Sequence, residues 1–354
     1  MIPEWIERYK RMRTEHFLRQ KYQYQYAFVG MGQHSLVNLY PALHHLGVPL
    51  RCICVATERK ARLIGERFPG IRTTTSLGEV LSDSRVKGVF VAASPSAHFR
   101  LASQVLESGK ALFIEKPPCR SLAELDELLE LQRQHASPIA MVGMQQRFAP
   151  AIGVLRRKLR HRDPSFPLSY SMRYLTGAYP EGDALLDLFI HPLDLACHLF
   201  GQAQVASCQR AGRGTLVLML RHPGCVGTME LSTDYSWTDA AEELRVLTPD
   251  GAYRLEQAEQ LTFAPRPARL IGIPIEKLNP HASRTRYIYY NRNGMVPTAE
   301  NNPVFSQGFY DELRTFVHAV ERGTEDNRAP LSSLRDTFKL IEELRTGILG
   351  TVGL

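Results

Sequence analysis

The chain has 354 residues, of which 44% are hydrophobic and 22% charged, so it exceeds the usual size of one domain and can bury a substantial core. It carries 43 Lys and Arg against 36 Asp and Glu, and the net charge of +7 suits an anionic partner such as a phosphate-bearing cofactor. Because the basic residues are interleaved with acidic ones and no recognition module accompanies them, we do not expect nucleic-acid binding.

The cysteines and the lengths of the apolar runs indicate the cellular compartment in which the protein works. The six cysteines lack metal-type spacing and mostly lie in apolar runs, which fits a reducing cytoplasm and predicts no metal site: Cys52, Cys54, Cys119, Cys197, Cys208 and Cys225. No stretch approaches the roughly 18 apolar residues of a membrane span, so no membrane association is expected. Residues 1–25 alternate charges and lack the apolar core of a secretory signal, and we expect a helical extension with Trp5, Ile6 and Tyr9 on one face.

From Tyr26 the chain alternates short apolar runs with helical patterns. Strands are expected at 26–30, 50–57, 86–94, 111–116 and 138–146, and helices at 35–47, 59–68, 97–109 and 121–135. Ser121 and Glu124 have the spacing of a capping box at the start of the last helix. This alternation predicts a parallel sheet with helices on both faces over residues 26–147.

After Phe148 the pattern changes to strands without helices between most of them. Strands are expected at 168–174, 204–210, 214–222, 225–234 and 243–255, with a turn at Pro249 to Gly251, so residues 148–354 are predicted to form an α+β domain built on an antiparallel sheet. Two helices end this domain, and the last can pack back on the first domain. Residues 265–303 are expected to be loops with one strand at 287–290. The exposed face of such a sheet commonly pairs with a second copy, so a homodimer or homotetramer is expected.

The stretch "YAFVGMGQHS" contains a glycine turn between the first strand and the first helix. A dinucleotide pyrophosphate would bind there on backbone N–H groups, with Gln33 and His34 beside it. Gly30 allows the tight turn, Gly32 lets a ligand approach the backbone, and Ser35 stands where the fingerprint has a third glycine. The alternative is an ordinary turn without a cofactor.

The end of the second strand distinguishes NAD from NADP. Thr57 occupies the place where an acidic residue would bind the ribose hydroxyls, and Arg59 and Lys60 follow it. Arginine suits a 2'-phosphate, so NADP is slightly preferred over NAD. Glu58 keeps NAD open, and Arg59 and Lys60 can instead be solvated charges at a helix start.

The stretch "ALFIEKPP" places Lys116 at the carboxyl end of a parallel strand, where such sheets bind ligands. With this motif the sequence resembles the glucose-fructose oxidoreductase and inositol dehydrogenase (Gfo/Idh/MocA) family, from Tyr26 to about Arg345. The resemblance also covers "VGMGQHS", "VAASPSAHF", "MVGMQQRFAP" and "LLDLFIHPLDL". It implies an N-terminal Rossmann domain (α/β), a C-terminal antiparallel-sheet domain (α+β) and bound NAD(P).

The resemblance also implies the reaction site. In "LLDLFIHPLDL", Asp187 and His191 are four residues apart and are expected on one helix face, with Asp194 three further along. Lys116, Asp187 and His191 would line the site: His191 as acid/base, Asp187 setting its orientation or proton exchange, and Lys116 stabilising charge on the reacting oxygen.

Other residues follow the family pattern. Ser94, Pro95, His98, Glu115 and Gln145 are expected at the cofactor, and Arg147, Tyr174, Tyr179 and Asp194 at the substrate. Phe189 occupies a place where the family usually has glycine, and a large ring there can fill space needed by the nicotinamide or the substrate. Arg147 can instead tie the domains together through backbone carbonyls, and the two tyrosines can be plain packing.

The leading hypothesis is an NAD(P)-dependent oxidoreductase that transfers a hydride between nicotinamide and a sugar, cyclitol or related polyol. The alternatives are an imine reductase or a glycoside-cleaving enzyme of the same fold, and a non-catalytic cofactor-binding sensor or assembly subunit.

Overall fold

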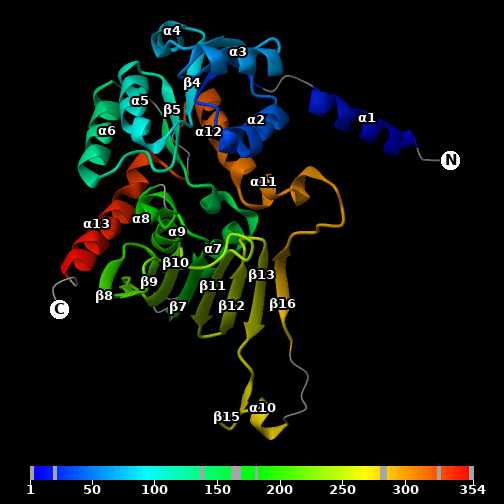
Figure 1. The fold of residues 1–354 in the computed structure, drawn as a ribbon. Helices are drawn as coiled ribbons and strands as arrows, with labels where there is room; N and C mark the ends of the chain where they lie inside the picture. The colour runs from blue at the N-terminus through cyan, green and yellow to red at the C-terminus, as the bar shows by residue number, and fades with distance from the viewer. Residues whose placement is uncertain are drawn as a thin grey trace.

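The computed structural model describes residues 4–18, 22–135, 139–160, 169–179, 182–279, 285–324 and 328–350. Two large sheets dominate the fold, and a shared set of helices joins them (Figure 1). The first sheet has six parallel strands in the order β3-β2-β1-β4-β5-β6. This is the Rossmann strand order. The strands are β1 (Gln25–Val29), β2 (Leu50–Cys54), β3 (Arg72–Thr74), β4 (Val86–Val91), β5 (Ala111–Glu115) and β6 (Ala140–Gly143).

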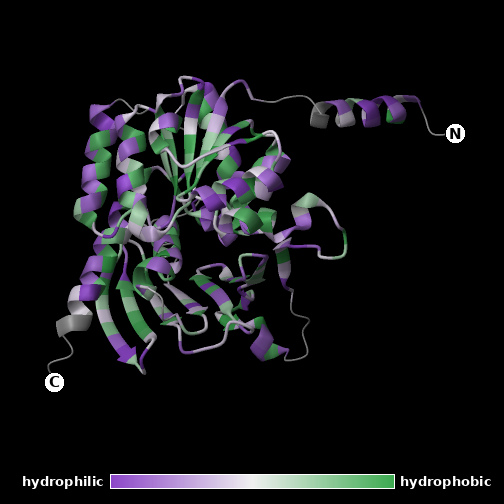
Figure 2. Cartoon of the chain, turned by 45° about the horizontal axis from the view of Figure 1, so that its top comes forward, coloured by the Kyte–Doolittle hydropathy of each residue, from purple (hydrophilic) through white to green (hydrophobic). Residues whose placement is uncertain are grey.

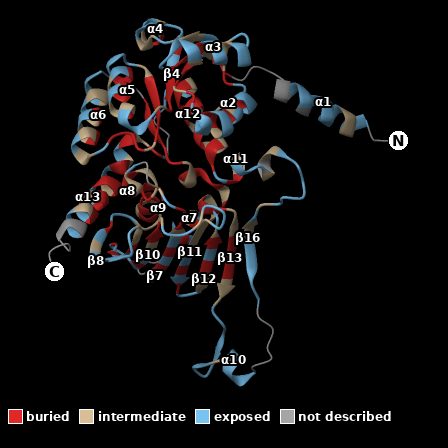
Figure 3. Ribbon diagram, in the orientation of Figure 1, coloured by how far each residue is buried: buried red, intermediate tan, exposed pale blue. Residues whose placement is uncertain are grey.

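Helices cover both faces of this sheet, so the strands are buried apolar runs, as Figures 2 and 3 show. On one face lie α5 (Pro95–Glu107) and α6 (Leu122–Gln134), and on the other α2 (Tyr40–Leu46) and α12 (Phe309–Arg322). Phe316 of α12 contacts Phe90 of β4 edge-on at 5.1 Å between ring centres. A helix from the C-terminal part of the chain therefore completes the core of the first sheet.

The helices expected from the sequence in this part of the chain begin and end near the predicted residues. The helix that follows the glycine turn begins as a π-helical turn, η1 (Ser35–Leu39), continues as α2 and ends at Gly47, whose φ of 75° suits glycine. The helices α3 (Glu58–Arg67) and α4 (Leu77–Ser82) lie beside β3 and β2, and η2 (Gln145–Phe148) leads out of the sheet. Ser121 Oγ caps α6 by accepting from Glu124 N, as expected, but the Glu124 carboxylate accepts from Arg120 N rather than from Ser121 N.

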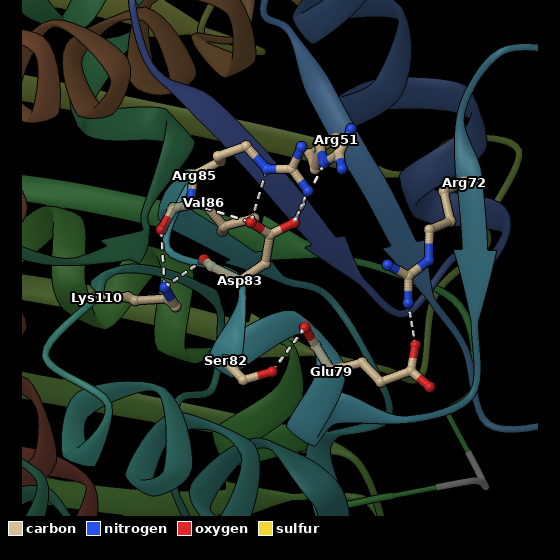
Figure 4. Close-up of polar contacts among 8 residues, drawn as sticks. All are labelled: Arg51, Arg72, Glu79, Ser82, Asp83, Arg85, Val86 and Lys110. Atoms are coloured by element: carbon tan, nitrogen blue, oxygen red, sulfur yellow. Dashed lines mark hydrogen bonds and ion pairs between the residues drawn. The ribbon is translucent and has the colours of Figure 1, made fainter.

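A polar cluster joins the amino ends of β2, β4 and β5 (Figure 4). Arg85 and Arg51 donate to the Asp83 carboxylate and hold its pKa below the usual range. The Lys110 ammonium donates to the carbonyls of Asp83 and Val86 at 3.0 and 2.9 Å. These contacts lie at the edge of the sheet opposite the glycine turn.

The second sheet has eight strands in the order β16-β13-β12-β11-β7-β10-β9-β8. All its pairs are antiparallel except the parallel pair of β7 and β10, so the sheet is mixed. Its strands are β7 (Ser169–Leu175), β8 (Gln204–Ala211), β9 (Thr215–Arg221), β10 (Val226–Ser232), β11 (Ala241–Thr248), β12 (Gly251–Glu256), β13 (Gln260–Pro265) and β16 (Tyr287–Asn291). The strand expected at 287–290 is β16.

Within the described part of the chain, helices cover one face of the second sheet and leave the other without helices. The covering helices are α7 (Pro150–Arg160), α8 (Ala184–Asp187), α9 (Ile190–Phe200) and α13 (Arg335–Gly350). Phe200 of α9 stacks on Tyr170 of β7 at 4.2 Å. The alternation along β9 follows from this one-sided cover, because Leu216, Leu218 and Leu220 are buried and the residues between them are exposed.

The last helix, α13, contacts both parts of the molecule. It packs on β8 and α9, and its Glu342 accepts from the backbone N–H of Leu122 at the start of α6. It follows η4 (Leu331–Leu334), which lies beside β6. The remaining elements are peripheral: α1 (Glu4–Leu18), the β14 (Arg269–Leu270) and β15 (Ile273–Pro274) arm, α10 (Ile275–Leu278), η3 (Ala299–Asn301) and α11 (Pro303–Ser306).

Candidate cofactor and active site

A cavity of about 730 Å³ opens at the carboxyl edge of the first sheet. It is lined by the ends of four neighbouring strands and by the start of α5, which is where doubly wound sheets bind ligands. The lining includes Gly30, Gly32, Gln33, His34, Ser35, Ala56, Lys60, Ala93, Ser94, Pro95, His98, Arg100, Glu115 and Lys116.

The glycine turn forms one wall of this cavity. Gly30 has a φ of 86°, and a Cβ there would lie 2.3 Å from the Ala92 carbonyl oxygen, so only glycine fits. At Gly32 a Cβ would meet nothing within 4 Å, so the backbone there is open to a ligand. Ser35 is buried at the first helical position. The N–H groups of this turn and helix start fit a dinucleotide pyrophosphate.

Thr57 and Glu58, after the end of β2, bind other parts of the protein in this structure, although they were expected at the cofactor ribose. The Thr57 hydroxyl caps α3 by accepting from Lys60 N at 3.3 Å, and Glu58 accepts from the Thr75 hydroxyl at 2.6 Å. Among the described residues, Lys60 and Arg100 line the cavity, whereas Thr57 and Arg59 do not. Arg100 was not among the expected cofactor residues, because only the packing of α5 against the sheet brings it to the cavity.

Glu115, His34 and His98 also line this cavity. The Glu115 carboxylate is buried and lies 3.5 Å from His34 Nε2. His98 Nδ1 lies 2.7 Å from the Pro117 carbonyl and donates to it, because a carbonyl can only accept. Burial lowers the pKa of His98, so the ring is neutral and its Nε2 is an acceptor with no partner in the part of the chain that the structure describes. A buried acceptor beside the cavity is what a bound cofactor would satisfy.

Lys116 follows β5, at the end of the cavity nearest the second sheet. Its ammonium donates to the Asp187 carbonyl at 2.7 Å, and the Lys116–Pro117 peptide bond is cis. Burial lowers the pKa of Lys116, and the neighbouring Glu115 and Asp187 oppose that shift. The lysine therefore joins the first domain to the start of the helices that cover the second sheet.

The expected single helix through Asp187 and His191 is wrong. The chain forms α8, which ends at Asp187, and then α9, which begins at Ile190. Pro192 has no N–H and its ring would clash with the carbonyl four residues earlier, so it is tolerated only in the first turn of a helix. The helix therefore restarts two residues before Pro192.

This break separates the Asp187 carboxylate from His191. Asp187 Oδ2 accepts from Asp183 N at 3.1 Å and from the Tyr179 hydroxyl at 3.4 Å. His191 is buried, and its Nδ1 has no partner among the described residues. Burial, followed by the positive charges of Lys116 and His34, lowers the pKa of His191 well below its usual value. His191 is thus a neutral imidazole, and in this structure Asp187 acts on Lys116 through its carbonyl rather than on His191.

Phe189 does not line the cofactor cavity. Its side chain is 3% exposed, and its ring meets Tyr174 edge-on at 6.3 Å. The ring faces β7 and a separate cavity that Tyr179 also lines. The space beside Lys116 is therefore not filled by this phenylalanine.

Arg147 and Asp194 bind each other. Arg147 Nε donates to Asp194 Oδ2 at 2.7 Å and Nη2 donates to Oδ1, in a bidentate ion pair in which both side chains are 3% exposed. Arg147 Nη1 also donates to the Arg328 carbonyl and the Ser333 hydroxyl, and Thr337 donates to Asp194. Because these donors and acceptors are used within the protein, the expected substrate contacts of both residues are corrected to a structural role that joins η2, α9 and α13.

A second cavity of about 200 Å³ adjoins His191 on the inner face of the second sheet. Its lining includes Gln145, which was expected at the cofactor, with Gln146, Tyr174, Thr176, His191, Glu242, Gln257 and Gln307. Glu242 was not among the expected site residues. The sequence pattern could have indicated it. Glu242 alternates with Leu244 and Val246 on the face of β11 that turns toward the core, where an acidic residue is unusual.

Comparison with known proteins shows similarity to one family of oxidoreductases. A model described as an oxidoreductase family with an NAD-binding Rossmann fold, Gfo/Idh/MocA, matches residues 24–144. The NAD⁺-dependent scyllo-inositol 2-dehydrogenase of Bacillus subtilis is 26% identical over 54% of this chain and 58% of its own length. The myo-inositol 2-dehydrogenase of Thermotoga maritima is 26% identical over 84% of this chain and 90% of its own.

Residues 24–144 are therefore similar to the NAD-binding Rossmann part of the Gfo/Idh/MocA family of oxidoreductases, and the similarity to the inositol dehydrogenase of Thermotoga maritima extends over most of the chain. A solved structure, a dehydrogenase from Chromobacterium violaceum, superposes with a TM-score of 0.76 at 20% identity, covering 94% of this chain and 98% of that one. The two-domain fold expected from the resemblance to the Gfo/Idh/MocA family is confirmed. Within the described ranges no cluster of three metal-binding side chains occurs, and no helix there has the length and apolar character to cross a membrane.

Proposed function

We propose that this protein is an NAD(P)-dependent oxidoreductase that transfers a hydride between the nicotinamide and a sugar, cyclitol or related polyol. The observation that carries the proposal is that Lys116 lines the cofactor cavity and His191 the second cavity, near enough for the Lys116 charge to lower the pKa of His191. The two groups come from different domains, so packing within either one does not account for their proximity. The inositol dehydrogenases of Bacillus subtilis and Thermotoga maritima among the relatives support a polyol substrate.

The chemistry divides between the cofactor and the chain. When bound, the nicotinamide ring accepts or returns the hydride. Neutral His191 accepts the hydroxyl proton of the alcohol, because its lowered pKa keeps it unprotonated at neutral pH. The Lys116 ammonium donates to the same oxygen and stabilises its developing negative charge. The Asp187 carbonyl holds that ammonium in place.

A slight preference for NADP follows from the residues at the adenosine end of the cavity. The Glu58 carboxylate is bound to Thr75 and the Thr57 hydroxyl is used as a helix cap. Lys60 and Arg100 line the cavity and supply positive charge for a 2'-phosphate. Arg59, the arginine considered at first, is not part of this wall.

Replacing Lys60 with alanine should weaken NADPH binding about tenfold and leave NADH binding within about twofold, because a charge-assisted hydrogen bond to a phosphate is lost. The measurement is a fluorescence titration with each nucleotide at fixed ionic strength. Arg59→Ala is the matched control, since Arg59 precedes Lys60 and does not line the cavity. Equal losses for both nucleotides would contradict a role of Lys60 at the 2'-phosphate.

The proposed function is tested by titrating the wild-type protein with NADPH and NADH and then measuring turnover on a panel of sugars and cyclitols. Saturable nucleotide binding with turnover of a polyol is expected. If neither nucleotide binds, the glycine turn is only a turn and the enzyme proposal is abandoned. If the nucleotide binds and no polyol is turned over, the non-catalytic sensor becomes the better reading.

We also propose a cytoplasmic homodimer or homotetramer. All six cysteines are free, which fits a reducing compartment. The uncovered face of the second sheet exposes Val217, Met219, Val226 and Leu247, each by more than 40%. A mass in solution of at least twice the 40.0 kDa chain is therefore expected by light scattering. A single species of monomer mass at micromolar concentration would contradict the assembly.

A further inference from the structure

We propose that the cavity beside His191 binds the protonated amino group of an amino sugar or amino cyclitol, with Glu242 as the carboxylate that recognises it. This inference rests on the proposed function and specifies its substrate class. The amino group lies on a carbon other than the reacting one, so it takes no part in the oxidation. Oxidation of a neighbouring hydroxyl to a carbonyl remains the work of Lys116 and His191.

The carboxylate of Glu242 is held in a defined position. Glu242 lies opposite Tyr174 in the register of β11 and β7, and its backbone N–H donates to Gln257. Gln146 Nε2 donates to both carboxylate oxygens, at 3.0 and 2.9 Å. Gln146 Oε1 is buried and has no partner among the described residues, so this amide also has an acceptor free for a ligand.

The cavity gives this carboxylate no positive partner. The titratable groups that face it are Tyr174 on β7 and His191 on α9, and burial keeps both neutral by raising the pKa of Tyr174 and lowering that of His191. No lysine or arginine is among the described residues that line the cavity. Burial raises the pKa of Glu242 to about 7, against the lowering effect of Gln146.

A partly buried carboxylate without a counter-ion is costly, so a ligand cation is the group that complements it best. A hydroxyl would donate a hydrogen bond but leave the charge uncompensated. An ammonium supplies both the charge and up to three donors.

The size and the walls of the cavity favour a compact polar ligand. Its volume of about 200 Å³ is below the ~300–1,000 Å³ of sites for drug-sized molecules. His191 and Glu242 line the same space, so one ring can reach both. Gln145, Thr176 and Gln307 offer further donors and acceptors for ring hydroxyls.

The test is calorimetric titration of the protein, saturated with NADP⁺, with matched pairs of ligands at pH 7. Glucosamine is compared with glucose and N-acetylglucosamine, and scyllo-inosamine with scyllo-inositol. At least one amine is expected to bind about tenfold more tightly than its neutral counterparts. Binding should also release part of a proton as Glu242 ionises, which is measured as a dependence of the heat on the buffer.

The variant Glu242→Gln should lose both the preference for the amine and the proton release, while NADPH affinity is unchanged. Glu243→Gln is the matched control, because Glu243 is the next residue, pairs with Arg254 and lies on the other face of the sheet. The proposal is overturned if no amine is preferred by the wild-type protein, or if Glu242→Gln keeps the preference. Failure of the proposed function would differ, because either nucleotide binding or turnover of every polyol in the panel would then be absent.

Discussion

Replacing Lys116 with methionine is expected to lower kcat/KM by about 10²- to 10³-fold, the usual cost of removing a donor to a developing oxyanion. Methionine keeps much of the length of the side chain but has no ammonium to donate to the reacting oxygen. The fold should persist, because the ammonium has one hydrogen bond to the protein that the structure gives, to the Asp187 carbonyl. The measurement is steady-state kinetics on the polyol found in the panel, with circular dichroism to check the fold.

Lys110 provides a matched control at the opposite end of β5. Its ammonium also donates to backbone carbonyls, those of Asp83 and Val86, but it lies at the edge of the sheet away from the cofactor cavity (Figure 4). Lys110→Met should lower the melting temperature and leave kcat/KM unchanged. If Lys116→Met keeps full activity on an identified substrate, the assignment of the reaction site is wrong.

Replacing Arg147 with methionine should lower the free energy of unfolding by about 3–5 kcal/mol, because Asp194 is left as a buried charge without its partner. Both side chains of the pair are 3% exposed, so water cannot replace the lost hydrogen bonds without a local rearrangement. Urea denaturation monitored by fluorescence measures the loss.

The double variant Arg147→Met, Asp194→Leu distinguishes two contributions to the lost stability. One is the loss of the ion pair itself, and the other is the cost of leaving the Asp194 charge buried without a partner. It should recover a large part of the stability, since two apolar groups replace two charges. A loss below about 1 kcal/mol in the single variant, or no recovery in the double variant, would contradict the structural role of this pair.

Some features could be predicted from sequence because they depend on neighbours along the chain. The buried runs that become β1, β4 and β5 alternate with helical periods, and this alternation determines a parallel sheet. Gly30 was recognisable because the turn between a strand and a helix needs a positive φ. The position of Lys116 followed from the end of β5. The restart of the helix at Ile190 was also encoded, in Pro192, although the spacing of Asp187 and His191 favoured one continuous helix.

Other features depended on contacts between residues far apart in the chain. The sequence spacing of Arg147 and Asp194 gives no sign that they form one ion pair, and α12 completes the first sheet although it lies more than 160 residues beyond β6 in the chain. The neutrality of His191 and the uncompensated charge of Glu242 are set by the groups that surround each side chain. The sequence by itself determined the elements, the glycine turn and the lysine, because these follow from local periodicity and backbone sterics. Only the tertiary structure decided which charges are paired, buried or left for a ligand, because desolvation and Coulomb energies depend on distances in space.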